Sequence, residues 1–150
     1  MDGNHAAHCA IDAHHAIDAH RAIDSTACAG ITIDMLGCDL SVCKLAELPE
    51  GLLDEGLCFV ARTSDELSVV CETAVVPTDA LAREDGWRAL KVRGPLDFAL
   101  TGIMAKISSA LADARVAIFA VSTFDTDCVL VKEDKLDTAI AALRAAGCEI

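Results

Sequence analysis

Hydrophobic and polar positions alternate along short stretches of the chain from residue 31 onward, and this pattern predicts β-strands. The second half also has two stretches whose apolar residues recur at helical spacing. The first of them has its apolar face at Ile103, Ile107 and Leu111. The expected strands cover residues 31–36, 40–45, 57–63, 67–71, 87–92, 116–123 and 128–132, and a last one starts at residue 148.

The order of the expected elements is most regular in residues 87–150. A strand is followed by a helix from Thr101 to about Ala114, two strands, a second helix that starts at Asp134, and a final strand. Thr101 is expected at the N-cap of the first helix, because its hydroxyl can accept a hydrogen bond from an unpaired amide of the first turn. This order is the βαββαβ pattern of a ferredoxin-like sandwich.

The first half of the chain shows a weaker version of the same pattern. Short helices are expected over residues 46–53, where Pro49 interrupts, and just after Pro77. The sequence therefore predicts an α+β fold of two ferredoxin-like modules, residues 31–86 and 87–150. We expect the modules to pack side by side, with antiparallel sheets and with helices on one face.

Residues 1–30 differ from the rest of the chain. They hold all five histidines and three copies of Ala-Ile-Asp, which start at Ala10, Ala16 and Ala22. A period of six residues fits neither a helix nor a coiled coil, so we expect a disordered low-complexity extension. Two interpretations stay open: a tandem-repeat extension without a role, or capture of a metal ion by imidazoles. The candidate metal ligands are His5, His8, His14, His15 and His20.

The composition limits the classes of function. Hydrophobic side chains make up 53% of the chain, and the formal net charge is -12 with only 12 Lys and Arg residues. This charge argues against nucleic acids and anionic membranes as partners. The longest apolar run, residues 116–121, is far shorter than the roughly 20 residues of a membrane-spanning helix. No basic segment precedes an apolar stretch at the start, so no secretory signal is expected.

The eight cysteines point to a cytoplasmic protein. They contain no Cys-X-X-Cys spacing, and several lie within strand-like runs, as Cys58, Cys71 and Cys128 do. A thiol in such a run behaves as a small hydrophobic side chain, and a chain with this apolar content needs no disulfide framework. We therefore expect reduced thiols with a structural role.

Catalytic chemistry finds little support in the residues. No histidine follows His20, so the body of the chain has no imidazole base for a Ser-His-Asp or Cys-His set. Neither a P-loop nor a GxGxxG motif is present. We expect a protein that is not an enzyme and that uses no cofactor.

Two segments of the second half are suited to binding a small zwitterion together. The helix expected from Thr101 offers unpaired backbone N–H groups and the positive end of its dipole, and Gly102 lets an anion approach the backbone closely. Asp125 and Asp127 follow a strand and are suited to an ammonium group or a basic side chain. The alternative is that the first segment only starts a helix and that the second is a solvated hairpin turn.

The same segments carry a family resemblance. Residues 94–105 (Gly-Pro-Leu-Asp-Phe-Ala-Leu-Thr-Gly-Ile-Met-Ala), 118–127 (Ile-Phe-Ala-Val-Ser-Thr-Phe-Asp-Thr-Asp) and 129–133 (Val-Leu-Val-Lys-Glu) look like the small bacterial proteins made of tandem ACT domains. Those proteins are similar to the regulatory part of lysine-sensitive aspartate kinases and to the cytosolic arginine sensor. The resemblance covers about residues 31–150 and has no counterpart for the first thirty residues.

The resemblance implies a non-catalytic sensor or regulatory protein that binds a free amino acid at an interface between modules or subunits. It also implies a homo-oligomer, because ACT-like modules commonly pair their sheets edge to edge. An alternative from a different class is a structural or protein-interaction subunit that dimerises through ACT-like sheets without a ligand. The positions that match the family's ligand site are Leu100, Thr101, Gly102, Ile103, Ser122, Thr123, Phe124, Asp125, Thr126 and Asp127.

Overall fold

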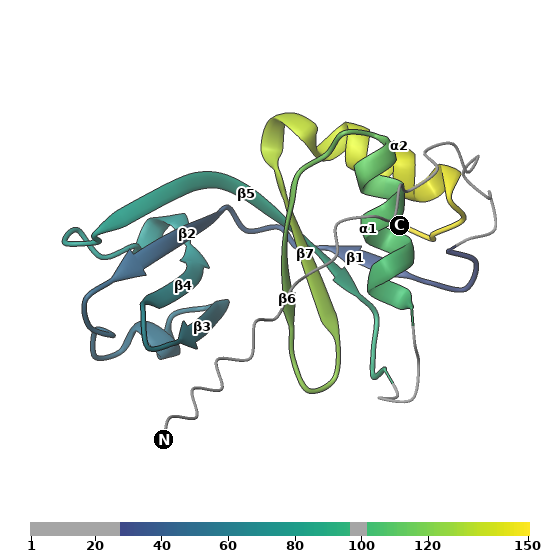
Figure 1. Ribbon diagram of the computed structural model, residues 1–150. Helices are drawn as coiled ribbons and strands as arrows, with labels where there is room; N and C mark the ends of the chain where they lie inside the picture. The colour runs from purple at the N-terminus through teal and green to yellow at the C-terminus, as the bar shows by residue number, and fades with distance from the viewer. Residues whose placement is uncertain (1–27, 97–101) are drawn as a thin grey trace, which may run out of the picture.

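The computed structural model describes residues 28–96 and 102–150. Within these ranges the chain forms one sheet, in which all strands pair antiparallel, and two α-helices (Figure 1). The expected α+β class with an antiparallel sheet is therefore confirmed. The strands are β1 (Ile33–Met35), β2 (Leu40–Leu45), β3 (Cys58–Arg62), β4 (Leu67–Glu72), β5 (Ala82–Val92), β6 (Ile118–Ser122) and β7 (Asp127–Lys132). The helices are α1 (Ile103–Asp113) and α2 (Leu136–Ala145), and three short 3₁₀ turns are η1 (Leu52–Asp54), η2 (Thr73–Val75) and η3 (Glu133–Lys135).

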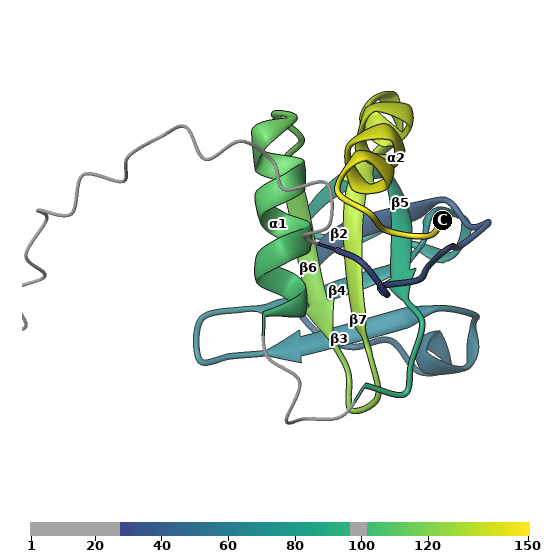
Figure 2. The ribbon, with the colours of Figure 1, turned by 90° about the vertical axis from the view of Figure 1, so that its right-hand side faces the viewer.

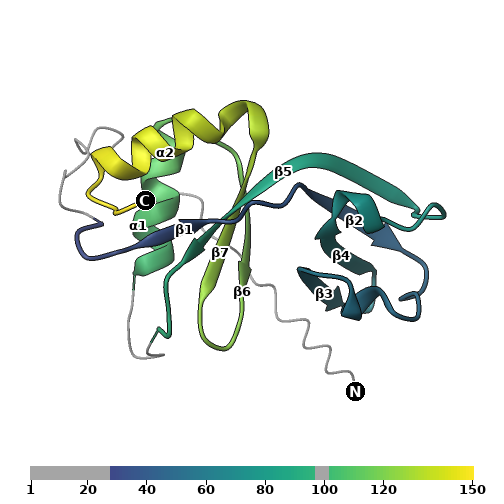
Figure 3. The same cartoon turned by 180° about the vertical axis from the view of Figure 1, so that it is seen from behind.

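β5 is the strand to which both halves of the sheet are attached. The order across the sheet is β3-β4-β2-β5-β7-β6, and β1 also pairs with β5. The first half of β5 pairs with β2, and its second half, from Trp87, pairs with β7. Figure 3 shows β1 alongside this second half. The sequence predicted only residues 87–92 as strand, so the expected module boundary after residue 86 falls inside β5.

The two α-helices lie next to each other over one face of the second half of the sheet (Figure 2). Successive residues of a strand point to opposite faces, so Leu90 and Val92 face the helices while Ala89 does not. Ile107 and Leu111 of α1 meet them in the largest buried cluster. The helical spacing of apolar residues thus predicted the buried face of α1 correctly.

The first half of the chain carries no α-helix within the described residues. The helix expected over 46–53 is wrong, because the segment is a loop in which Gly51, with a φ of 82°, precedes the short turn η1. The helix expected just after Pro77 is also wrong. Since β5 already begins at Ala82, too few residues follow the proline to form a helix. The helices on one face therefore belong to the second half alone.

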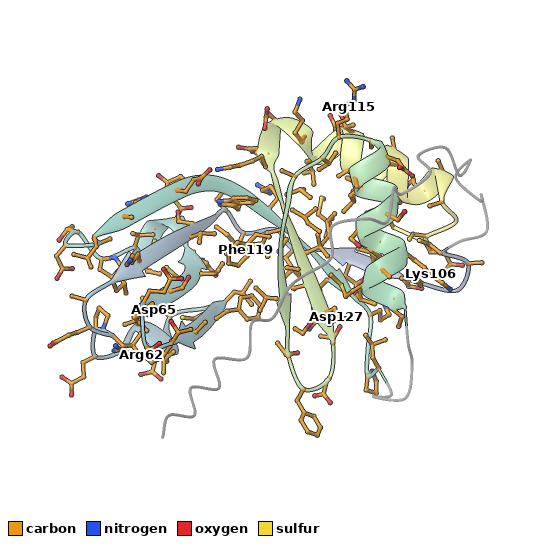
Figure 4. The ribbon with its side chains drawn as sticks, in the orientation of Figure 1. Arg62, Asp65, Lys106, Arg115, Phe119 and Asp127 are labelled. Carbon is orange, nitrogen blue, oxygen red and sulfur yellow. The ribbon has the colours of Figure 1, made fainter. Side chains whose placement is uncertain are left out.

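The opposite face of the sheet carries a second apolar cluster that spans both halves. It contains Leu40 of β2, Val70 of β4, Trp87 of β5 and Leu130 of β7. Phe119 of β6 packs against it and meets Trp87 edge to face, with ring centroids 6.2 Å apart. Figure 4 shows Phe119 between β6 and the half of the sheet formed by β2–β4. This cluster ties the half that bears helices to the half that lacks them.

The seven cysteines within the described residues are free thiols, and five of them are buried. Burial raises the pKa of Cys71 to about 11, and burial together with the neighbouring Cys28 raises the pKa of Cys148 to about 12. A thiol with so high a pKa stays protonated at neutral pH and is a poor nucleophile. These side chains therefore act as small apolar groups of the core.

The last expected strand, from residue 148, is reduced to a single bridge. Glu149 pairs in parallel with Thr32, just before β1. The amide of Cys28 also donates to the carbonyl oxygen of Ala146 at 2.8 Å. The C-terminal segment is therefore tied to the segment that leads into β1 rather than forming a further strand.

Leu111 tests the packing of helices on the sheet, because it is fully buried in α1. The Leu111→Ala variant is expected to lose about 2–5 kcal/mol of unfolding free energy, since it removes apolar contacts and leaves a cavity. Ser109→Ala, at an exposed position of the same helix, is the matched control and should change it by less than about 0.5 kcal/mol. Urea unfolding followed by the fluorescence of Trp87, the single tryptophan of the chain, measures both. Equal midpoints for the two variants would contradict the assigned core.

Candidate functional site

A cavity of about 280 Å³ lies where the β6–β7 turn meets the start of α1. Figure 4 shows Asp127 at this end of β7, close to the first turn of α1. The helix and the turn belong to different parts of the chain, so the cavity exists only because the sheet and the helix pack together. The residues that line it are Leu96, Gly102, Ile103, Met104, Ser122, Thr123, Phe124, Asp125, Thr126 and Asp127.

The structure brings together eight of the ten positions expected from the sequence. They are Gly102, Ile103, Ser122, Thr123, Phe124, Asp125, Thr126 and Asp127. Leu100 and Thr101 lie outside the described residues. The expected histidine ligands His5, His8, His14, His15 and His20 also lie outside them.

Two lining residues were not among the expected site positions. Leu96 follows β5 by a few residues, and no polar group marks it as part of a site. Met104 follows Ile103 in the helix, and its apolar side chain carries no chemical sign of a site. Helical spacing places a side chain on a face, but it does not reveal that the first turn of that face borders a cavity.

The start of α1 forms one wall of the cavity. The residue before the helix is Gly102, with a φ of 83°, so the N-cap is not Thr101 as expected. The first hydrogen bond of the helix joins the amide of Lys106 to the carbonyl oxygen of Gly102 at 3.0 Å. The amides of Ile103 and Met104 precede that bond, so they have no partner inside the helix, and among the described residues no side chain caps them. These amides and the helix dipole favour a negative group in the cavity.

The β6–β7 turn forms the opposite wall and is held by its own hydrogen bonds. The amide of Thr123 donates to the carbonyl oxygen of Thr126 at 2.8 Å, and the Thr123 hydroxyl accepts from the Thr126 amide at 3.3 Å. This arrangement is typical of a turn closed by a threonine side chain. The hydroxyl of Thr123 is thus already engaged within the turn.

Thr126 connects the turn to β5. It is 8% exposed, and its hydroxyl donates to the carbonyl oxygen of Val92 at the end of β5. A buried hydroxyl needs such a partner, because an unmade hydrogen bond in the interior costs about 1–3 kcal/mol. The sequence assigned this hydroxyl to a ligand, whereas the structure gives it a partner in the protein.

Two carboxylates give the turn wall its charge. Asp127 accepts a hydrogen bond from the Ser122 hydroxyl across the hairpin, and Asp125 lies on the exposed part of the turn. The lining residues include no Lys, Arg or His. The cavity therefore combines amides that have no partner inside the helix on one wall with two acidic residues on the other.

The β3–β4 hairpin repeats this turn at the other end of the sheet. The amide of Thr63 donates to the carbonyl oxygen of Glu66 at 2.9 Å, as Thr123 does to Thr126, and each residue of the second turn lies 60 positions after its counterpart. The strand registers repeat with the same offset, because Phe59 faces Val70 and Phe119 faces Leu130. An α-helix accompanies only the second hairpin within the described residues.

Other functional features are absent from the part of the chain that the structure describes. In that part, no three His, Cys, Asp or Glu side chains are grouped so that they would hold a metal ion. No helix among those residues has both the length and the apolar character to cross a membrane.

Comparison with known proteins gives a family for the part that contains the cavity. Residues 82–145 match the ACT domain family. The cytosolic arginine sensor for mTORC1 subunit 1 of Homo sapiens is 36% identical over 72 residues, which are 45% of this chain and 22% of that protein. The chain thus spans about a fifth of the length of the curated relatives it matches.

Solved structures extend the similarity to most of the chain. Protein Atu0741 from Agobacterium tumefaciens is 34% identical, with a TM-score of 0.73, over 79% of this chain and 90% of that one. The regulatory subunit of aspartate kinase from Thermus thermophilus shares the fold, with a TM-score of 0.56 at 11% identity over 79% of this chain and 97% of that one. The chain therefore contains an ACT domain and belongs to the same family as the Agobacterium protein.

Proposed function

We propose that this protein is a non-catalytic amino-acid sensor or regulatory protein whose ligand site is the cavity between α1 and the β6–β7 turn. One observation carries the proposal: Ile103 and Met104, whose amides have no partner inside the helix, line the same space as the two acidic residues Asp125 and Asp127. A free amino acid presents a carboxylate and an ammonium group, and each needs a partner when it leaves water. The two walls offer one partner for each group.

A basic amino acid fits the charge of the cavity best. The α-ammonium group neutralises one carboxylate, and a second positive group on the ligand neutralises the other, since no basic side chain lines the cavity. Arginine and lysine both meet this requirement. The name of the mammalian relative, a cytosolic arginine sensor, agrees with this ligand class.

Regulation without catalysis is supported by the chemistry of the cavity. Its lining has the hydroxyl groups of Ser122, Thr123 and Thr126 and the carboxylates of two aspartates, but it includes no histidine, lysine or cysteine. The fold is shared with regulatory subunits of aspartate kinase. We therefore propose binding without turnover and without a cofactor, and the free thiols agree with a cytoplasmic location.

The repeated hairpins support a chain of two ACT-like modules. β2, β3, β4 and the first half of β5 form the first, which has kept the strands and the threonine turn but not the helices. The second half of β5 with α1, β6, β7 and α2 forms the second. Among the described residues a helix start faces the turn only in the second module, so we propose one ligand site per chain.

We also propose that two copies associate through β6. This strand ends the sheet, and its sequence Ile-Phe-Ala-Val-Ser has neither a charge nor a proline to protect its open edge. The same observation favours the second candidate function, a structural subunit that pairs through its sheet and binds no ligand. The response to amino acids separates the two candidates.

Thermal unfolding in the presence of each of the twenty amino acids tests the sensor hypothesis. Arginine or lysine should raise the midpoint, because a ligand at a hundred times its Kd adds about 2.7 kcal/mol to the stability of the folded state. Glutamate, whose extra charge has the wrong sign, is the matched control and should give no shift. No shift with any amino acid at millimolar concentration would contradict the sensor function.

Asp125→Asn tests the location of the site. It keeps the shape of the side chain but removes the charge, so it should weaken arginine binding about tenfold or more, as expected for a lost charge-assisted hydrogen bond. Asp65→Asn changes the matching position of the β3–β4 turn and should leave the affinity unchanged. Isothermal titration calorimetry measures both. If the two variants bind arginine equally well, the cavity is not the site.

Ala120→Lys tests association through β6. Ala120 is exposed in the middle of the strand, and a lysine there brings two positive charges together where two edges meet, so the dimer should dissociate. Ala112→Lys, at an exposed position of α1, should leave the dimer intact. Sedimentation equilibrium gives the masses. A wild-type protein that is monomeric at tens of micromolar would refute association through this edge.

A further inference from the structure

The chain that leaves β5 passes unusually close to the β6–β7 turn. At Gly94, an added Cβ would lie 2.7 Å from the carbonyl oxygen of Asp125 and 3.3 Å from the Cβ of Thr126. The first distance is too short for any carbon, and the atom in the way belongs to the backbone. Only a residue without a side chain allows the two segments to approach this closely.

Hydrogen bonds on both sides of Gly94 hold the same turn. Two positions before it, the carbonyl oxygen of Val92 accepts from the buried hydroxyl of Thr126. Two positions after it, the amide of Leu96 donates to the carbonyl oxygen of Asp125 at 2.8 Å. The segment therefore lies against the turn at residues 92, 94 and 96, and Gly94 is the middle one of the three.

These contacts act on the cavity itself. Leu96, Asp125 and Thr126 all line the cavity. The segment after β5 therefore holds the turn in place, and its own residue Leu96 is part of the lining. A side chain at position 94 would push the Asp125 carbonyl away from the Leu96 amide. The Asp125 carboxylate, which is attached to the same residue, would then move relative to the amides of α1.

We propose that Gly94 is a positioning residue for the ligand site: it lets the segment after β5 hold Asp125 at the distance from α1 that an amino acid requires. The inference rests on the proposed function of the cavity and adds a residue that does not line it. Gly94 acts through Asp125 and Thr126 and touches no ligand itself.

The first half of the sheet offers a comparison. Leu40 of β2 pairs with Glu72, and Trp87 of β5 pairs with Lys132, which lies 60 positions after Glu72. Position 40 of the first half therefore corresponds to position 87 of the second half. By that relation Glu47, which is exposed, stands where Gly94 stands in the second half. A glutamate side chain is incompatible with so close an approach to the turn. The geometry that holds Asp125 therefore belongs to the half of the chain that has the cavity.

The test compares Gly94→Ala with Gly37→Ala. A Cβ at Gly37 meets nothing within 4 Å, so that variant controls for the general effect of replacing a loop glycine. With L-arginine as the probe, calorimetry should give an affinity weakened about tenfold or more for Gly94→Ala and unchanged for Gly37→Ala. The amide NMR signals of Leu96 and Thr126 should shift in Gly94→Ala, whereas those of β2–β4 should not. Gly94→Ala that binds arginine like the wild type overturns the proposal.

Two further experiments cover the cases in which Gly94→Ala does not fold or the wild type does not bind arginine. If Gly94→Ala does not fold, Thr126→Val and Thr126→Ser replace it. Weaker arginine binding by Thr126→Val, with the affinity retained by Thr126→Ser, supports the positioning of the turn. Equal arginine affinity of both variants and the wild type overturns it. If the wild type binds no arginine, the proposed function fails on its own, and the NMR signals of Gly94→Ala then decide the positioning. Unchanged signals of Leu96 and Thr126 would overturn it.

Discussion

The hydrogen-bonded pairing along β5 is the constraint on which the rest of the structure depends. This strand of 11 residues joins β2 on one half of the sheet to β7 and β1 on the other. Because side chains alternate between faces, its pairing commits Leu90 and Val92 to the core under the helices and Trp87 and Ala89 to the cluster shared by both halves. A shift of one residue in this strand would exchange the two sets.

The end of β5 also determines where the cavity lies. The strand stops at Val92, whose carbonyl oxygen holds Thr126, and the following segment holds Asp125 through Leu96. α1 then packs its apolar face on the sheet so that its first turn borders the same space. The site is thus a consequence of core packing on one side and of backbone hydrogen bonds on the other, and neither wall is sufficient alone.

The two hairpins show how one local motif acquires different roles. The threonine turns at Thr63 and Thr123 have matching backbone hydrogen bonds and matching strand registers. In the part of the chain that the structure describes, only the second turn faces a helix start, and there Gly94 permits close contact with the segment after β5. Local sequence makes the turn, and the surrounding structure decides whether it borders a cavity.

Periodicity by itself determined the strands and both α-helices, because alternation and helical spacing report directly which faces are buried. Asp125 and Asp127 were also accessible from the sequence as acids that follow an apolar strand, and the resemblance to ACT-domain proteins implied the other turn positions from Ser122 to Thr126. The absence of helices in the first half was not accessible. The extension of β5 back to Ala82 uses residues that a local pattern assigns to a loop or helix, and such pairing depends on partners far away in the chain.

Only the tertiary structure decided which groups of the site are available. Thr126 and the residues at the helix start were both among the positions expected to contact a ligand. Folding gives the hydroxyl to Val92 and moves the capping position to Gly102, so the amides of Ile103 and Met104 have no partner inside the helix. Leu96 lines the cavity, and Gly94 lies against the turn behind it, although both precede the turn by about 30 residues in the chain. A sequence records which donors and acceptors a chain carries, but the fold decides which of them the protein itself has already used.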